Sequence, residues 1–98
     1  MTNNHHDNLD DLRGRIDAID DNIRMLLLER QDLSQQVALE KIKQGNTIVY
    51  RPDREAEQYA RLVDTFPNKK MRTHYKHCLD VIIKESRAIQ QDVIDNRL

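Results

Sequence analysis

The residues best suited to chemistry in this chain are long cations that stand where apolar side chains are expected. Arg30 takes the heptad position between Leu26 and Leu33 in a periodic apolar run. A guanidinium at such a position is costly unless it meets an anion. Lys41 comes eleven residues later, which on a helix leaves it about 20° from Arg30 and about 16 Å away along the axis. Both side chains therefore point the same way, and they can hold a small anion between them, beside Val37.

Polar groups also interrupt an apolar face near the C-terminus. Ser86 and Gln90 stand at i and i+4 on the face that carries Ile83, where they offer neutral hydrogen-bonding groups. Arg54 and Glu55 open a separate predicted helix and can close the same site from another direction. Cationic clamps, two neutral polar contacts and one acid together suit a small dicarboxylate.

Arg13 requires a second chain if it is to join this site. It precedes Arg30 by seventeen residues, which on a helix is about 25 Å along the axis and about 100° around it. The first helix of a partner in a two-fold dimer can bring its Arg13 in, which predicts a homodimer with two shared sites. Each residue taken alone has an ordinary explanation, such as a register-setting Arg or a solvated Lys. The site is predicted from their combination.

Three helices must position these residues, and no segment has the pattern of a strand. The first is predicted over residues 8–43, the second from Pro52 or Asp53 to Thr65, and the third over 71–96. About 36 residues give the first helix a length of roughly 54 Å, more than the width of so small a globule, which favours a partner helix. Its apolar positions alternate in spacing between three and four, as in a heptad seam: Leu9, Leu12, Ile16, Ile19, Ile23, Leu26, Leu33 and Val37.

Composition limits the other possibilities. The 98 residues are expected to form a single domain, 1–98, whose residues 1–7 are a disordered polar tail. The expected fold class is all-α, with three helices per chain and an intertwined two-fold homodimer.

The 16 Lys and Arg balance 17 Asp and Glu, which argues against a nucleic-acid partner. No apolar run suits a membrane span or a signal peptide, and the lone Cys78 fits a reducing, cytoplasmic compartment.

A metal site is a weaker interpretation of one short segment. His74 and His77 are three residues apart and next to Cys78, which resembles a ligand pair. Zinc sites usually need four groups, and the chain has no second ligand cluster. We therefore expect no metal and no cofactor.

In their order and spacing these motifs resemble the all-helical chorismate mutases over about residues 8–95. Each stretch is weak alone, and the three-helix setting makes them specific together. The matching stretches are Leu12-Arg13 through Ile16-Asp17, Leu28-Glu29-Arg30, Val37 to Lys41, Asp53-Arg54-Glu55, Ile82-Ile83, Glu85-Ser86 and Gln90-Gln91.

The resemblance implies an isomerase that converts chorismate to prephenate by a Claisen rearrangement in phenylalanine and tyrosine biosynthesis. Arg13 of one subunit and Arg30 of the other would hold the substrate carboxylates. Lys41 and Gln90 would donate to the ether oxygen of the breaking bond. The remaining contacts would be Glu55 to the ring hydroxyl, Arg54 in support of that corner, Ser86 to a carboxylate, and Val37 and Ile83 as the apolar wall.

One departure from the family pattern leaves related functions open. Family members often carry an acid three residues before the Arg-Glu pair, and here that position is Arg51. An aminodeoxychorismate mutase therefore remains an alternative. An isochorismate-pyruvate lyase has the same scaffold, although such lyases tend to lack the acid and serine found here as Glu55 and Ser86. A non-catalytic coiled-coil dimer module is a more remote alternative, and it leaves Arg30 and Gln90 unexplained.

Overall fold

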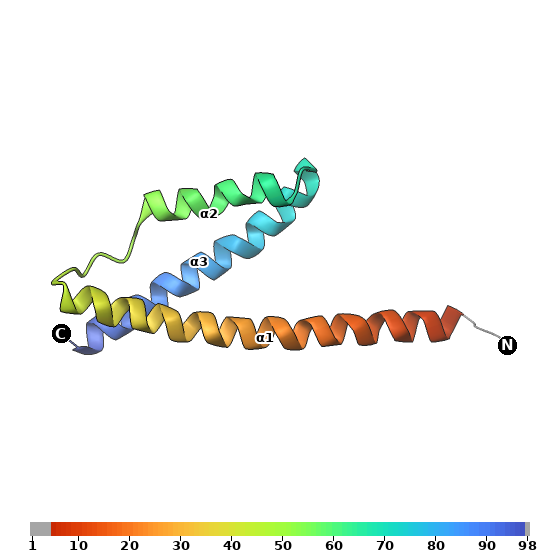
Figure 1. The fold of residues 1–98 in the computed structure, drawn as a ribbon, viewed down its shortest axis with the longest axis horizontal. Coiled ribbons are helices and arrows are strands. Elements are labelled where there is room, and N and C mark those ends of the chain that lie inside the picture. Colours follow the sequence, from red (N-terminus) through yellow and green to blue (C-terminus); the bar gives the residue numbers. More distant parts are fainter. Residues whose placement is uncertain (1–4, 98) are drawn as a thin grey trace. The chain divides into compact units, whose positions relative to one another are not determined.

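The computed structural model describes the backbone of residues 5–97 and the side chains of residues 8–97. It contains three helices, α1 (His5–Lys43), α2 (Pro52–Thr65) and α3 (Lys69–Arg97), and residues 5–97 include no strand (Figure 1). The predicted all-α class with a long first helix is confirmed. Of the predicted disordered tail, α1 takes in residues 5–7, whereas residues 1–4 lie outside the described part. The chain divides into two compact units, Met1–Asp32 and Leu33–Leu98.

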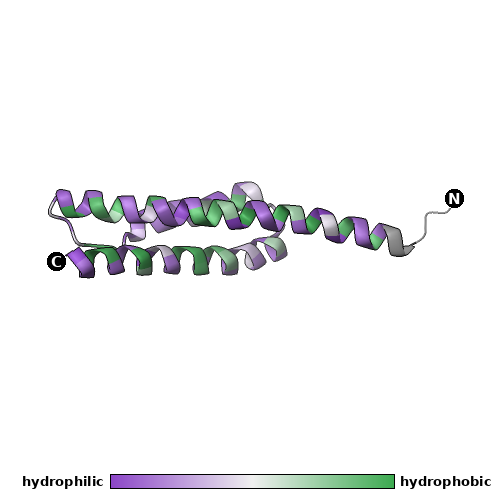
Figure 2. Cartoon of the chain, turned by 90° about the horizontal axis from the view of Figure 1, so that it is seen from below, coloured by the Kyte–Doolittle hydropathy of each residue, from purple (hydrophilic) through white to green (hydrophobic). Residues whose placement is uncertain are grey.

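The first unit consists of the N-terminal part of α1, and it exposes its heptad face. Green hydrophobic bands recur between purple ones along this helix (Figure 2). Apolar stripes of this kind are typical of helices that pair with another helix. The exposed large side chains of the unit include Leu9, Leu12, Ile16, Ile19, Ile23 and Leu26.

The second unit begins with the last part of α1, whose end is closed by a glycine. Gly45 has φ 73°, and its N–H donates to Ile42 O at 3.0 Å while Asn46 N–H donates to Lys41 O at 2.8 Å. This pair of bonds satisfies carbonyls that the helix end leaves free, and it requires the left-handed backbone that glycine adopts without strain. The chain therefore leaves the helix just after Lys43 and passes through a loop to α2.

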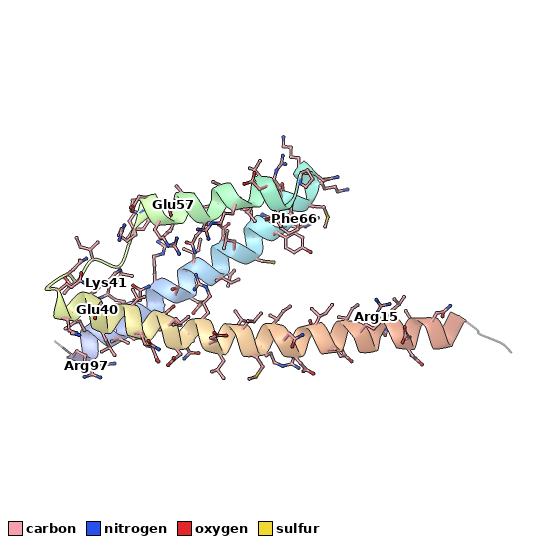
Figure 3. The ribbon with its side chains drawn as sticks, viewed as in Figure 1. Arg15, Glu40, Lys41, Glu57, Phe66 and Arg97 are labelled. Carbon is pink, nitrogen blue, oxygen red and sulfur yellow. The ribbon has the colours of Figure 1, made fainter. Side chains whose placement is uncertain are left out.

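Helices α2 and α3 pack against each other in the second unit. Pro52 starts α2, and Pro67 ends it, as the sequence predicts. Asn68 begins α3, because its Oδ1 accepts from Lys70 N at 2.8 Å. At this turn the rings of Phe66, labelled in Figure 3, and Tyr75 stack with their centroids 4.1 Å apart.

The buried part of the second unit is small. Ala38, Ile83 and Ile94 are its buried hydrophobic side chains, and Ser34 is buried with them. A core of this size is typical of a short chain that relies on further contacts for its stability. Within residues 5–97, no helix has both the length and the apolar character that a bilayer crossing requires.

Candidate active site

Four polar side chains form one hydrogen-bonded chain between α1 and α3 in the second unit. Lys41 Nζ donates to Gln90 Oε1 at 3.0 Å, and Gln90 Nε2 donates to Ser86 Oγ at a long 3.5 Å. Ser86 Oγ lies 2.8 Å from Ser34 Oγ, where either hydroxyl can be the donor. Three of the four residues, Lys41, Ser86 and Gln90, are predicted site residues, so the structure brings together groups from opposite ends of the second unit.

The loop after α1 holds Lys41 in this group. Lys41 Nζ donates to Ile48 O at 3.0 Å, and Asn46 Oδ1 accepts from Ile48 N at 2.9 Å, which fixes the loop backbone. Lys41 is labelled in Figure 3 near the end of α1, where the chain enters this loop. The ammonium is thus held by a backbone carbonyl on one side and an amide oxygen on the other.

A count of hydrogen-bond donors shows what these groups can offer a ligand. A lysine ammonium has three N–H donors, and two of those on Lys41 go to Gln90 and Ile48. The Gln90 amide has two N–H donors, of which one goes to Ser86. Within residues 8–97, each group thus has one N–H without a protein acceptor. Two donors on neighbouring side chains, one of them cationic, suit an oxygen that gains negative charge.

The electrostatic environment lowers the pKa of Lys41. Partial burial makes its charged form less favourable, and the positive charge of Arg51 adds to this effect in the same direction. Lys41 therefore loses its proton at a lower pH than a free lysine does. A bound anion would offset both effects, which is a property expected of a cation at an anion-binding site.

Glu55 lies in a second polar cluster with Arg87 and Tyr50. The Glu55 side chain is only 15% exposed, and its Oε2 lies 3.4 Å from Arg87 Nε. Arg87 Nε is buried, and no acceptor among the described residues lies in hydrogen-bonding geometry for it. The Arg87 guanidinium carbon also lies 5.3 Å from the centre of the Tyr50 ring, a cation–π distance. Arg87 thus supplies the positive charge that a largely buried carboxylate needs.

The two arginines at the start of α2 are paired within that helix and its first turn. Arg51 binds both carboxylate oxygens of Asp53, at 3.0 and 2.7 Å. Its hydrogen bond lowers the pKa of Asp53 to about 2 and raises the pKa of Arg51. Arg54 is exposed and lies 3.5 Å from Glu57. Arg51 therefore does not replace the missing acid, and it places a positive charge near Lys41 instead.

The other predicted site residues differ in their surroundings. Ile83 is buried, whereas Val37 is 45% exposed in this chain. Arg13 and Arg30 belong to the unit Met1–Asp32, in which Arg13 is exposed and Arg30 is half-buried. Their role in the site stays a prediction.

The segment with the metal-like spacing carries no cluster of ligands. His74, His77 and Cys78 are all exposed. Within the described residues no group of three or more His, Cys, Asp or Glu side chains is placed to hold a metal ion.

Comparison with known proteins agrees with these motifs and this arrangement. Residues 12–91, more than three quarters of the chain, match the family model of chorismate mutase type II. The chain belongs to the chorismate mutase type II family. Membership makes it a chorismate mutase, an enzyme of the isomerase class, and confirms the resemblance identified from the sequence motifs. No significant match was found among curated proteins or among solved structures.

Two side chains of the site were missed in the sequence, for different reasons. Ser34 is seven residues before Lys41, so it shares the helix face of that residue, and this spacing could have identified it. Arg87 follows Ser86 directly, but its pairing with Glu55 joins α3 to α2 and has no local signal. The Ile48 carbonyl is a backbone group in a loop, which no side-chain pattern indicates.

The Arg87–Glu55 pair predicts that removal of Arg87 destabilises the protein more than removal of an exposed lysine does. We expect Arg87→Ala to lower the free energy of unfolding by about 1–2 kcal/mol, because a largely buried carboxylate loses its partner. Lys43→Ala, which removes an exposed pair with Glu40, should change it by less than about 0.5 kcal/mol. Urea denaturation at one protein concentration measures both. Equal effects of the two variants would contradict a stabilising role for Arg87.

Proposed function

We propose that this chorismate mutase catalyses the Claisen rearrangement of chorismate to prephenate, in phenylalanine and tyrosine biosynthesis in the cytoplasm. The observation that carries the proposal is the contact between Lys41 and Gln90, since it leaves two N–H donors for one ligand oxygen. The exposed, unpaired Cys78 is consistent with a reducing compartment.

The reaction is unimolecular, so it needs no nucleophile and no general base. The protein has to hold the enolpyruvyl side chain over the ring, which lowers the entropic part of the barrier. It must also stabilise the negative charge that develops on the ether oxygen as the carbon–oxygen bond breaks. Lys41 and Gln90 perform this second task, because donors placed in advance cost no reorganisation at the moment of reaction.

The two substrate carboxylates require cations from two chains in this proposal. Arg30 of one subunit and Arg13 of the other bind them with their guanidinium forks, and Ser86 donates to one of them. The exposed heptad face of Met1–Asp32 supports a homodimer, because a second copy of the same face would cover it. Val37, exposed in the single chain, and Ile83 form the apolar wall beside the ring.

Glu55 binds the ring hydroxyl in the proposed complex, and Arg54 supports that corner. Arg87 lies 3.4 Å from the Glu55 carboxylate, whose oxygens can accept a hydrogen bond from the hydroxyl. Arg51 is engaged by Asp53, so a single acid faces the hydroxyl where family members often have two. An aminodeoxychorismate mutase is the second candidate, because Arg51 stands where family members often carry the second acid near the ring hydroxyl, so the substituent at this ring position can differ.

An assay of product formation tests the proposed function directly. We expect the protein to consume chorismate and yield prephenate, and to act on isochorismate and aminodeoxychorismate far more slowly. Release of pyruvate from isochorismate as the fastest reaction would instead indicate the lyase. A protein that consumes none of the three and fails to bind a rigid dicarboxylate mimic of the transition state would be a coiled-coil module.

Replacement of Lys41 is expected to remove turnover without unfolding the protein. Lys41→Ala should lower kcat by about 100- to 1000-fold, because it deletes the cationic donor to the ether oxygen. Lys43→Ala, two residues further along the same helix, should retain normal kcat. Circular dichroism and gel filtration check that both variants fold alike. Near-normal turnover by Lys41→Ala would remove this residue from the mechanism.

The pH dependence of kcat/KM reports on the two donors. Gln90 donates without titrating, so we expect a nearly flat profile from about pH 6 to 8. Activity should fall at higher pH as Lys41 loses its proton, and this fall should begin earlier than for a lysine with the ordinary pKa of 10.5. Gln90→Glu should be active only at pH values where the new carboxyl is protonated. A steep loss between pH 6 and 8 in the unaltered enzyme would argue against Gln90 as a donor.

Mixed dimers test whether the two chains share their sites. Arg13→Ala and Arg30→Ala homodimers should both be nearly inactive. When the two are unfolded together and refolded, about half of the dimers are mixed, and each mixed dimer contains one intact site. We expect activity to return to about a quarter of the unaltered level. No gain on mixing would show that Arg13 and Arg30 act within the same subunit or not at all.

A further inference from the structure

A buried serine on α1 contacts one of the residues that are assigned to the substrate. Ser34 is 6% exposed and stands 2.8 Å from Ser86 across the contact between α1 and α3. Burial of a hydroxyl without a partner is unfavourable, and serine is disfavoured in the interior of a helix. A serine at this buried helical position therefore suggests a role for its hydroxyl group. An alanine would fill the position with similar volume, as Ala38 does one turn later on the same helix.

The direction of the hydrogen bonds from Lys41 through Gln90 to Ser86 follows from Lys41, because an ammonium group can only donate. Lys41 has no acceptor, so it must hold the carbonyl oxygen of Gln90, and the amide nitrogen of Gln90 then faces Ser86. Ser86 Oγ accepts this bond with one of its two lone pairs. Its second lone pair and its single proton remain to be assigned.

Two assignments are possible, and they leave Ser86 with different hydrogen-bonding groups for a ligand. If Ser86 donates to Ser34, its proton is used inside the protein, and the hydroxyl can offer a ligand only a lone pair. If Ser34 donates to Ser86, both lone pairs are occupied, and the Ser86 proton is left for a third group. A carboxylate has no proton to give, so it binds only the second arrangement.

We propose that Ser34 is a positioning residue that donates to Ser86 and thereby directs the Ser86 proton to a carboxylate of the substrate. This inference rests on the proposed function, in which Ser86 contacts that carboxylate. Ser34 touches no substrate atom itself. By occupying the second lone pair of Ser86 it holds that hydroxyl with its proton toward the ligand, so less ordering is needed on binding.

The proposal predicts which kinetic constant changes. A substrate carboxylate is negatively charged in the ground state and in the transition state alike, so its contact contributes to both. Ser34→Ala should therefore raise KM by about five- to tenfold with kcat within about twofold of the unaltered value. Alanine favours helices more than serine does, so this variant is expected to fold.

Two further variants separate positioning from packing. Ser34→Thr keeps the hydroxyl and should restore KM to within about twofold of the unaltered value. Ile94→Val removes one buried methyl group of the same unit, and it should lower Tm while it leaves KM unchanged. An increase of KM in Ile94→Val as large as in Ser34→Ala would show that loose packing explains both, and would overturn the proposal.

A double-mutant cycle gives the decisive measurement. In a Ser86→Ala background, Ser34→Ala should have no further effect on KM, because the hydroxyl that it directs is absent. An effect of equal size in both backgrounds would overturn the proposal, as would an unchanged KM for Ser34→Ala in an otherwise active enzyme. An unaltered enzyme that leaves chorismate unconverted would instead overturn the proposed function itself, and with it this inference.

Discussion

The hydrogen bond from Lys41 to Gln90 is the constraint on which the rest of the site depends. An ammonium cannot accept, so it fixes the amide with its oxygen toward Lys41 and its nitrogen toward Ser86. The order of donors is thereby set from Lys41 through Gln90 to Ser86, and within residues 8–97 one N–H on each of Lys41 and Gln90 has no protein acceptor. The contact requires the end of α1 to lie against α3, which the glycine-closed helix end and the loop carbonyl of Ile48 secure.

The distribution of burial explains why this enzyme is expected to function as more than one chain. The second unit buries few side chains, and the first leaves its heptad face uncovered. A short helical chain gains little stability from so small a core. Covering the apolar face with a second copy would add buried area, and in the proposed complex it would also bring the partner subunit's Arg13 to the substrate. Stability and catalysis would then depend on the same surface.

Charge around the site is balanced by pairs that leave Lys41 as the cation with a spare donor. Arg51 is engaged by Asp53, Arg87 by Glu55, and Arg54 lies near Glu57. These pairs allow many charges near a small site without a large net field. Lys41 differs from them, because its burial and the positive charge of Arg51 both lower its pKa. A substrate with two carboxylates would supply the missing negative charge.

Local signals predict the three helices, since heptad spacing, Pro52, Pro67 and the Gly45 loop need no distant contact. The order and spacing of the motifs also identified the family. Helical periodicity put Ser86 and Gln90 on one face of a helix, and the expectation that Lys41 joins them came from the pattern of polar residues that interrupt apolar faces. The packing of the helices reveals three further contacts: Arg87 pairs with Glu55, Ser34 contacts Ser86, and the Ile48 carbonyl in the loop accepts from Lys41. Those contacts join residues from different elements. Periodicity along one helix cannot reveal them, because they depend on how that helix packs against another.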